Sequence, residues 1–252
     1  MHLAMEGPVS LDLVGALVLT LISAIAIGVP ALWYARTRGG RVLLAAHILW
    51  FVAVLAFAAS GALNWRLDLG APVLGLAIVV PMLVLVFLAT AVPPTRAALA
   101  AIPVPALIAI HAIRVLGFLF LLLFAAGRIA APFAPEAGWG DVIAGATAVP
   151  VAWALASRGA GVRWLVLVWN SFGLLDFLAA SSLGMMSAPG SPLQVFFDAP
   201  GSTAMTALPW AIIPVFLVPQ LLVGHLAIYW RLPRTAEEFV SNGLGMNVHR
   251  RA

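Results

Sequence analysis

Long apolar runs recur along almost the whole chain, and this feature decides what the chain can fold into. Each run has about 20 residues, enough at ~1.5 Å per residue to cross a hydrocarbon core of roughly 30 Å. Of the 252 residues, 63% are hydrophobic and only 9% are charged, whereas about a quarter of the residues of a soluble domain are charged. The sequence therefore predicts an all-α, multi-pass membrane protein.

The breaks between the runs predict seven transmembrane helices that form a single domain over residues 1–252. The predicted spans are 11–34, 42–62, 72–92, 104–127, 138–157, 163–184 and 206–231, followed by a short tail at 232–252. The first run has Glu6 and Asp12 at its start and basic residues only after it. A cleaved signal peptide has the reverse order of charges, so we expect this run to be a retained span.

The arginines predict the orientation of the bundle. All 13 basic residues are arginines. Ten would lie on one side of a seven-span bundle (Arg36, Arg38, Arg41, Arg96, Arg158, Arg163, Arg231, Arg234, Arg250 and Arg251) and two on the other (Arg66 and Arg128). Because cytoplasmic loops are enriched in basic residues, we expect the N-terminus outside and the C-terminus in the cytoplasm. Arginines scattered at the ends of apolar runs are not a nucleic-acid surface, so no nucleic-acid partner is expected.

An internal repeat is indicated by two similar segments at the ends of spans one and five. Residues 29–39 read VPALWYARTRG and residues 149–159 read VPVAWALASRG, with five matching positions. The alternative is a chance match, because alanine, valine and proline are common in this chain. A 3+1+3 arrangement of parallel repeats resembles the topology of SWEET-type transporters. The resemblance is one of topology, and no functional residue is transferred from it.

Arg114 is the most unusual residue, because only His111 and Arg114 interrupt the apolar run from Val104 to Ala126. It lies about 15 Å deep at ~1.5 Å per residue, near the middle of a bilayer. Asp176 in span six lies about 20 Å deep from the same side. Ionised groups at such depths need a partner or water, so we predict that Arg114 pairs with Asp176. The pair either locks two helices together or belongs to a site.

Other polar residues of the spans favour a site. The predicted ligand or proton pathway contains Arg114, Asp176, Asn170, His111, Gln220 and His225. Asp141 lies near the predicted start of span five, where a carboxylate accepts hydrogen bonds from the free amides of a first helical turn. We expect it to cap that helix, and an outer gate is the alternative. No residue is assigned a catalytic role.

Three histidines lie at similar depths from one side, which raises the question of a metal or haem centre. His47, His111 and His225 lie on spans two, four and seven. No helix has two histidines at ligand spacing, so we expect no cofactor and no metal, with a centre on these three residues as the alternative. The chain has no cysteine, which excludes thiolate ligands, and no lysine, which excludes a retinal Schiff base.

The motifs AGWGD (residues 137–141) and WNSFGLLD (residues 169–176) resemble those of uncharacterised bacterial polytopic membrane proteins. This resemblance implies a multi-pass protein of the bacterial inner membrane and implies no activity.

Three function classes follow from the polar residues. The first is the binding or translocation of a small solute or a proton, gated by helices that proline interrupts. The second is a membrane-embedded enzyme on a lipid-soluble substrate, similar to seven-span terpene cyclases. The third is a non-catalytic membrane subunit or receptor-like scaffold. The expected partners are the lipid bilayer and a small solute or lipid-soluble ligand, and an oligomer is compatible with the sequence.

Overall fold

The computed structural model describes residues 8–63 and 70–243, and every regular element in these ranges is a helix. The long helices are α1 (Pro8–Tyr34), α2 (Arg38–Ala59), α3 (Gly70–Ala91), α7 (Phe133–Arg158), α8 (Arg163–Met186) and α9 (Val218–Gly243). Shorter segments are α4 (Pro93–Ala100), α5 (Val104–Ala109), η1 (Ile110–Gly117), α6 (Phe118–Ala125), η2 (Gly159–Val162), η3 (Thr203–Thr206) and η4 (Ile213–Leu217). The predicted all-α class is confirmed for these residues.

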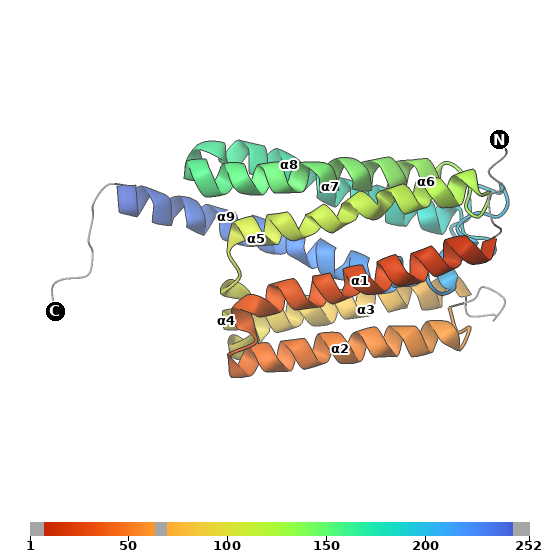
Figure 1. The fold of residues 1–252 in the computed structure, drawn as a ribbon, viewed down its shortest axis with the longest axis horizontal. Coiled ribbons are helices and arrows are strands. Elements are labelled where there is room, and N and C mark those ends of the chain that lie inside the picture. Colours follow the sequence, from red (N-terminus) through yellow and green to blue (C-terminus); the bar gives the residue numbers. More distant parts are fainter. Residues whose placement is uncertain (1–7, 64–69, 244–252) are drawn as a thin grey trace.

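Within the described ranges, six helical stretches are long and apolar enough to cross a membrane. They are Leu11–Tyr34, Arg38–Ala59, Val73–Ala91, Val104–Ala125, Phe133–Met186 and Ile213–Leu232. The fifth has 54 residues and contains α7 and α8, which lie side by side (Figure 1). Gly159 makes the turn between them with a φ of 58°, a left-handed conformation that favours glycine. By length and composition, the chain is a multi-pass membrane protein.

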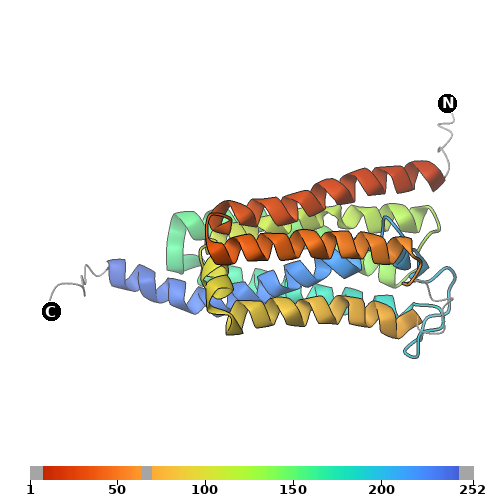
Figure 2. The same cartoon turned by 90° about the horizontal axis from the view of Figure 1, so that it is seen from below.

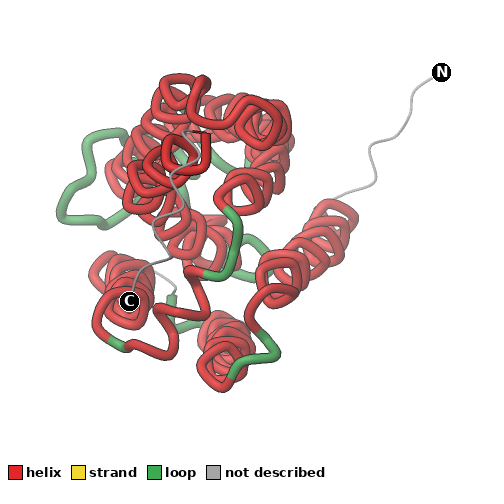
Figure 3. The backbone as a smooth tube through the Cα atoms, turned by 90° about the vertical axis from the view of Figure 1, so that its left-hand side faces the viewer, coloured by secondary structure: helices red, strands yellow, loops and turns green. Residues whose placement is uncertain are grey.

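The long helices form two groups with α9 between them. In Figures 1 and 2, α1, α2 and α3 lie together, and α5, α6, α7 and α8 form the second group. Helix α9 crosses the bundle obliquely and contacts α3, α5 and α8. Figure 3, which looks along the bundle, shows that most helices run close to one common axis. Residues of α9 can therefore face both groups.

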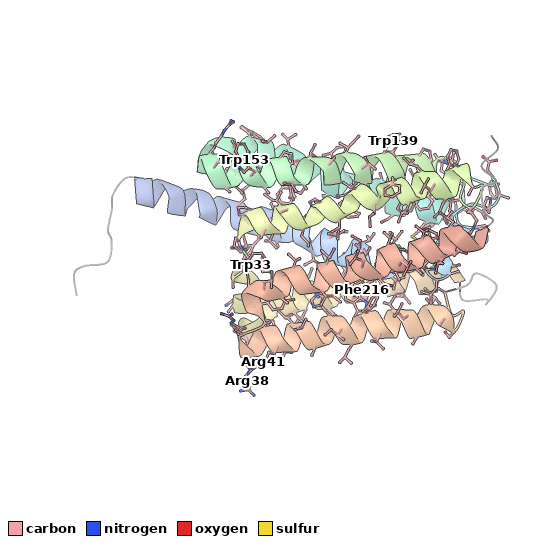
Figure 4. All side chains as sticks on the ribbon, in the orientation of Figure 1. Trp33, Arg38, Arg41, Trp139, Trp153 and Phe216 are labelled. Carbon is pink, nitrogen blue, oxygen red and sulfur yellow. The ribbon has the colours of Figure 1, made fainter. Side chains whose placement is uncertain are left out.

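The largest hydrophobic core lies where η4 meets α1, α2 and α6. Leu19, Leu119, Trp210 and Phe216 are almost completely buried there, and Phe216 lies inside the bundle in Figure 4. A second core joins α5, α7, α8 and α9 around residues such as Ile108. These two cores fix the helices on which the polar residues lie.

The outward faces of the helices expose apolar side chains. Leu17, Leu49 and Leu175 are each more than 60% exposed. Trp139 and Trp153 project from the outer face of α7 near its two ends (Figure 4) and are 58% and 66% exposed. Tryptophan is enriched at the two membrane–water interfaces. A surface of this kind is what lipid contact requires.

The helices of spans five and seven begin at residues other than the predicted starts of these spans. Helix α7 begins at Phe133, five residues before the predicted start, because Pro135 lies in the first turn, where proline is tolerated. Span seven was predicted from residue 206, but its helix begins with η4 at Ile213, since residues 207–211 form turns around Pro209. The predicted tail from residue 232 is helical as far as Gly243, and strong helix formers such as Glu237 explain this.

Span four is helical but is not a continuous α-helix. Its central segment η1 is a 3₁₀-helix of eight residues, whereas runs longer than about four residues are uncommon. The short helix α4 before it was not predicted; it begins with Pro93 and Pro94, which suit a first helical turn. In the two predicted repeat segments, α1 ends at Tyr34 soon after Pro30, whereas α7 continues well beyond Pro150. The repeat stays a prediction.

At the end of the bundle opposite α4, a polar contact ties α1 to two connecting segments. Nη1 of Arg128 donates to Oδ1 of Asp12 at 2.9 Å, and Nε1 of Trp210 donates to the same oxygen at 2.7 Å. The two charged side chains are 29% and 39% exposed. This contact is therefore a partly exposed ion pair.

Candidate functional site

Arg114 lies on η1, and small residues let this segment pack directly against α7. A Cβ atom on Gly145 of α7 would lie 2.3 Å from the backbone nitrogen of Val115. A Cβ atom on Gly117 would lie 2.6 Å from the carbonyl oxygen of Gly138. Larger residues would separate the two segments. The glycines therefore set the short distance across which Arg114 reaches its neighbours.

The guanidinium of Arg114 is bonded to three helices. Its Nε donates to Oδ1 of Asp141 on α7 at 2.6 Å, and its Nη2 donates to Oδ2 of Asp176 on α8. Its Nη1 donates to the carbonyl oxygen of Gly173 at 3.1 Å and to Nε2 of His225 on α9 at 3.0 Å. The Arg114 side chain is 1% exposed. These bonds replace the water that a buried cation loses.

Two glycines make room for the charged groups. A Cβ atom on Gly140 of α7 would lie 1.5 Å from Oδ1 of Asp176. A Cβ atom on Gly173 would lie 2.8 Å from Nη1 of Arg114. The ring of Phe177 covers one face of the guanidinium, with 3.8 Å from Cζ to the ring centroid, a cation–π contact. The pocket around the cation is therefore closely fitted.

The hydrogen bonds of His225 fix its tautomer. An arginine nitrogen only donates, so Nε2 of His225 accepts from Arg114 and is unprotonated. Its Nδ1 then holds the proton and donates to Oδ1 of Asn170 at 2.8 Å. The amide nitrogen of Asn170 donates to the carbonyl oxygen of His225 at 3.1 Å. Asn170 therefore holds His225 neutral and oriented toward Arg114.

His111 lies beside this network without joining it by a hydrogen bond. Its ring is 4.0 Å from the ring of His225, centroid to centroid, and 5.5 Å from the ring of Trp169. The residue is completely buried, and neither ring nitrogen has a hydrogen-bond partner. Most buried polar atoms in proteins are bonded, so His111 is an exception that needs an explanation.

The charged residues of the cluster do not balance. One guanidinium, that of Arg114, faces two carboxylates, those of Asp141 and Asp176. The side chains of Asp141 and Asp176 are 16% and 5% exposed. Two carboxylates on one buried cation leave one negative charge without a partner, and burial of an unpaired charge is costly. A proton on the carboxylate pair would make the cluster neutral.

Two cavities border the site. A small one of about 30 Å³ is lined by Arg114, Asp141 and apolar residues and has room for a water molecule. A larger one of about 300 Å³ extends from His111 and Gln220 to Tyr34 and Arg231. Leu221 lines both cavities. This residue therefore borders both spaces.

The structure brings together five of the six predicted site residues: Arg114, Asp176, Asn170, His111 and His225. Gln220 lines the larger cavity together with His111, and its amide nitrogen bonds none of the five. The expected capping role of Asp141 is wrong, because α7 begins two turns earlier and Asp141 bonds Arg114 instead. The signal for this role was Pro135, which moves the start of the helix toward the N-terminus.

The three histidines of the alternative metal centre do not share one site. His111 and His225 stack on each other, whereas Nδ1 of His47 bonds the carbonyl oxygen of Leu43 at 2.8 Å. Among the residues described by the structure, no three His, Cys, Asp or Glu side chains are arranged to hold a metal ion.

The sequence of the chain was compared with known protein families. The family model of a domain of unknown function, DUF8737, matches residues 71–233. The chain belongs to this family. The match covers Arg114, Asp141, Asp176 and His225, and leaves α1 and α2 outside it. No curated protein and no solved structure matches the chain. The proposed function is therefore based on the geometry of the site.

Proposed function

We propose that this DUF8737 protein binds and translocates a small solute together with a proton, and that the proton binds to the Asp141–Asp176 pair. One observation supports this most directly: the buried carboxylate of Asp176 and the partly buried carboxylate of Asp141 share the single guanidinium of Arg114. With one proton the cluster is neutral, and without it the cluster has one negative charge. A cluster that alternates between these states takes up and releases one proton per cycle.

Two cavities near the cluster support this proposal. The small cavity lies against Asp141, and the larger cavity ends at His111, whose ring stacks on His225. Leu221 stands between the two cavities. A solute in the larger cavity would contact His111, and His225 would pass the effect to Arg114 through the hydrogen bond they share.

The helices that hold the cluster also have segments suited to movement. Arg114 and His111 lie on the 3₁₀-helix η1. His225 follows the π-helix η4, which contains Pro214. Such departures from α-helical geometry in the middle of a span often mark hinges and functional sites. Bending at η1 and η4 would move Leu221 and expose the carboxylates first to one side of the membrane and then to the other.

The proposed topology is seven spans with the N-terminus outside and the C-terminus in the cytoplasm of a bacterial cell. Counting α7 and α8 as separate spans gives this number. Arg38 and Arg41 lie at the end of the bundle where α4 lies (Figure 4). Helices α7 and α8 also meet at this end, next to Arg158 and Arg163, whereas Arg128 lies at the other end. The positive-inside rule favours the cytoplasm for the end with more arginines.

The test is proton flux into liposomes. Full-length protein is reconstituted with an internal pH dye, and potassium with valinomycin imposes a negative potential inside. We expect wild-type vesicles to acidify faster than vesicles with the Asp141→Asn and Asp176→Asn double variant. Asp176→Asn alone keeps a neutral Arg114–Asp141 pair and should also lose the flux, which separates proton binding from misfolding. Asp12→Asn is the matched control. Equal rates for wild type and both cluster variants would overturn the proposal.

A further inference from the structure

The larger cavity has a mainly apolar wall, with polar side chains near both of its ends. Its volume is about 300 Å³, the lower limit of typical small-molecule pockets. Most of the residues that line it are leucine, isoleucine, valine or alanine, from the part of the chain that runs from α1 to η1 and from α9. Among the residues that the structure describes, no aspartate or glutamate lines it. The cavity therefore suits a small, mainly apolar ligand and offers no countercharge to a cation.

The polar groups at the inner end of this cavity lack partners. Both ring nitrogens of His111 and the amide nitrogen of Gln220 are buried without a hydrogen bond. Other polar side chains of the wall are bonded: Thr90 Oγ1 donates to the carbonyl oxygen of Val86, His47 Nδ1 bonds the carbonyl oxygen of Leu43, and Arg231 donates to the carbonyl oxygen of Ile102. Among the described residues that line the cavity, His111 and Gln220 are therefore the ones with fully buried nitrogens that lack a partner.

Neighbouring residues fix the position of the His111 ring. Its ring contacts the rings of Trp169 and His225, and Nε1 of Trp169 donates to the carbonyl oxygen of Ala144 at 3.1 Å. On the other side, a Cβ atom on Gly224 would lie 3.0 Å from Nε2 of His111, so the glycine leaves just enough space for the ring. His111 is held in place for an interaction that no protein group supplies.

We propose that the larger cavity binds an amphiphile with an apolar body and one neutral hydroxyl or carbonyl group, which hydrogen-bonds His111 and Gln220. A neutral imidazole has one donor and one acceptor, and the amide nitrogen of Gln220 only donates. A hydroxyl accepts from Gln220 and donates to the imidazole, and a carbonyl accepts from both. This inference rests on the proposed function, in which the amphiphile is the solute that accompanies the proton.

The experiment measures the saturable binding of four probes that share a ten-carbon chain: radiolabelled 1-decanol, decane, decanoate and decyltrimethylammonium. Full-length protein in nanodiscs is compared with empty nanodiscs, which removes partition into lipid. We expect decanol to bind about tenfold more tightly than decane, the effect of one net hydrogen bond. Decyltrimethylammonium should not bind. Equal affinity for decanol and decane, or tighter binding of decanoate, would overturn the inference.

Variants locate the binding. His111→Leu and Gln220→Leu should each weaken decanol binding about tenfold and leave decane binding unchanged. Ala89→Phe fills the cavity from α3, far from the charged cluster, and should abolish binding of both probes. Ala53→Phe adds the same side chain on the exposed face of α2 and should bind as wild type. Wild-type affinity of Ala89→Phe would contradict the inference even if the His111 variant does not fold.

The two proposals fail separately. Decanol binding that His111→Leu weakens, in a protein without proton flux, would keep this inference and overturn the proposed proton coupling. Proton flux that depends on Asp176, in a protein without saturable decanol binding, would keep the proton site and overturn the ligand class.

Discussion

The charged cluster and the larger cavity share η1 and α9, yet their polar groups differ in hydrogen bonding. Around Arg114, every contact is closely fitted, and the guanidinium is bonded by α7, α8 and α9. In the cavity, His111 and Gln220 have buried nitrogens without partners. A low dielectric makes unpaired polar groups costly. The guanidinium of Arg114 therefore has its partners within the protein, whereas the nitrogens of His111 and Gln220 do not.

The largest expected effect comes from removing both countercharges of Arg114. The double variant Asp141→Asn with Asp176→Asn leaves a buried cation without a carboxylate, and should lower the free energy of unfolding by about 3–5 kcal/mol. Unfolding by detergent titration in mixed micelles measures this. Each single variant keeps one carboxylate on Arg114 and should cost less than about 1 kcal/mol. Additive effects of the two single variants would show that the carboxylates do not share one cation.

The next effect tests the close fit of the cluster. Gly140→Ala places a methyl group on the carboxylate of Asp176 and should destabilise the protein by about 3 kcal/mol, the upper end for overpacking. The thermal unfolding midpoint should fall. Gly28→Ala on α1 is the control, because a Cβ atom there has nothing within 4 Å. A midpoint equal to that of the control would mean that α7 and α8 are not held together at this glycine.

A smaller effect tests the separation between the cluster and the cavity. Leu221 is buried and borders both spaces, so Leu221→Ala should cost about 2 kcal/mol, the lower end for a leucine-to-alanine change. Joining the spaces should also accelerate acidification in the liposome assay. Leu175→Ala on the exposed face of α8 is the matched control. An unchanged flux with Leu221→Ala would remove Leu221 as the barrier.

The smallest effect comes from the other ion pair of the bundle. Asp12 and Arg128 are partly exposed, and exposed pairs contribute about 0–1 kcal/mol. Asp12→Asn should therefore leave stability within about 1 kcal/mol of wild type in the same detergent titration. If Asp12→Asn lowers the free energy of unfolding as much as the double cluster variant does, burial does not explain the difference in stability between the Asp12–Arg128 pair and the Arg114 cluster.

Much of the fold follows from the sequence because apolar length and charge placement are local properties. The depth of Arg114 and Asp176 in their runs was enough to predict contact between these residues. Asp141 does not have the predicted capping role, because its contact depends on where α7 begins, and α7 begins at Phe133 rather than at the predicted residue 138. A helix start one or two turns earlier changes which residues face the bundle.

The remaining features of the site depend on helical phase and tertiary packing. Gln220 was grouped with Arg114 by depth, but it faces the cavity, and depth does not specify the face of a helix. The need for glycine at Gly140 follows only from the side chain opposite it on α8. The 3₁₀ geometry of η1 was likewise not predicted from its residues.

The protonation of the Asp141–Asp176 pair tests the account most directly. Infrared difference spectra of the full-length protein in nanodiscs, recorded during a pH titration, report the C=O stretch of a protonated carboxylic acid. As the pH falls, we expect a band equivalent to one such group per protein. Asp141→Asn and Asp176→Asn should each remove or shift this band, because the two carboxylates titrate as a unit. Asp12→Asn should leave the band unchanged. A band that persists in the double cluster variant, or no titrating band while the protein is folded, would contradict the account.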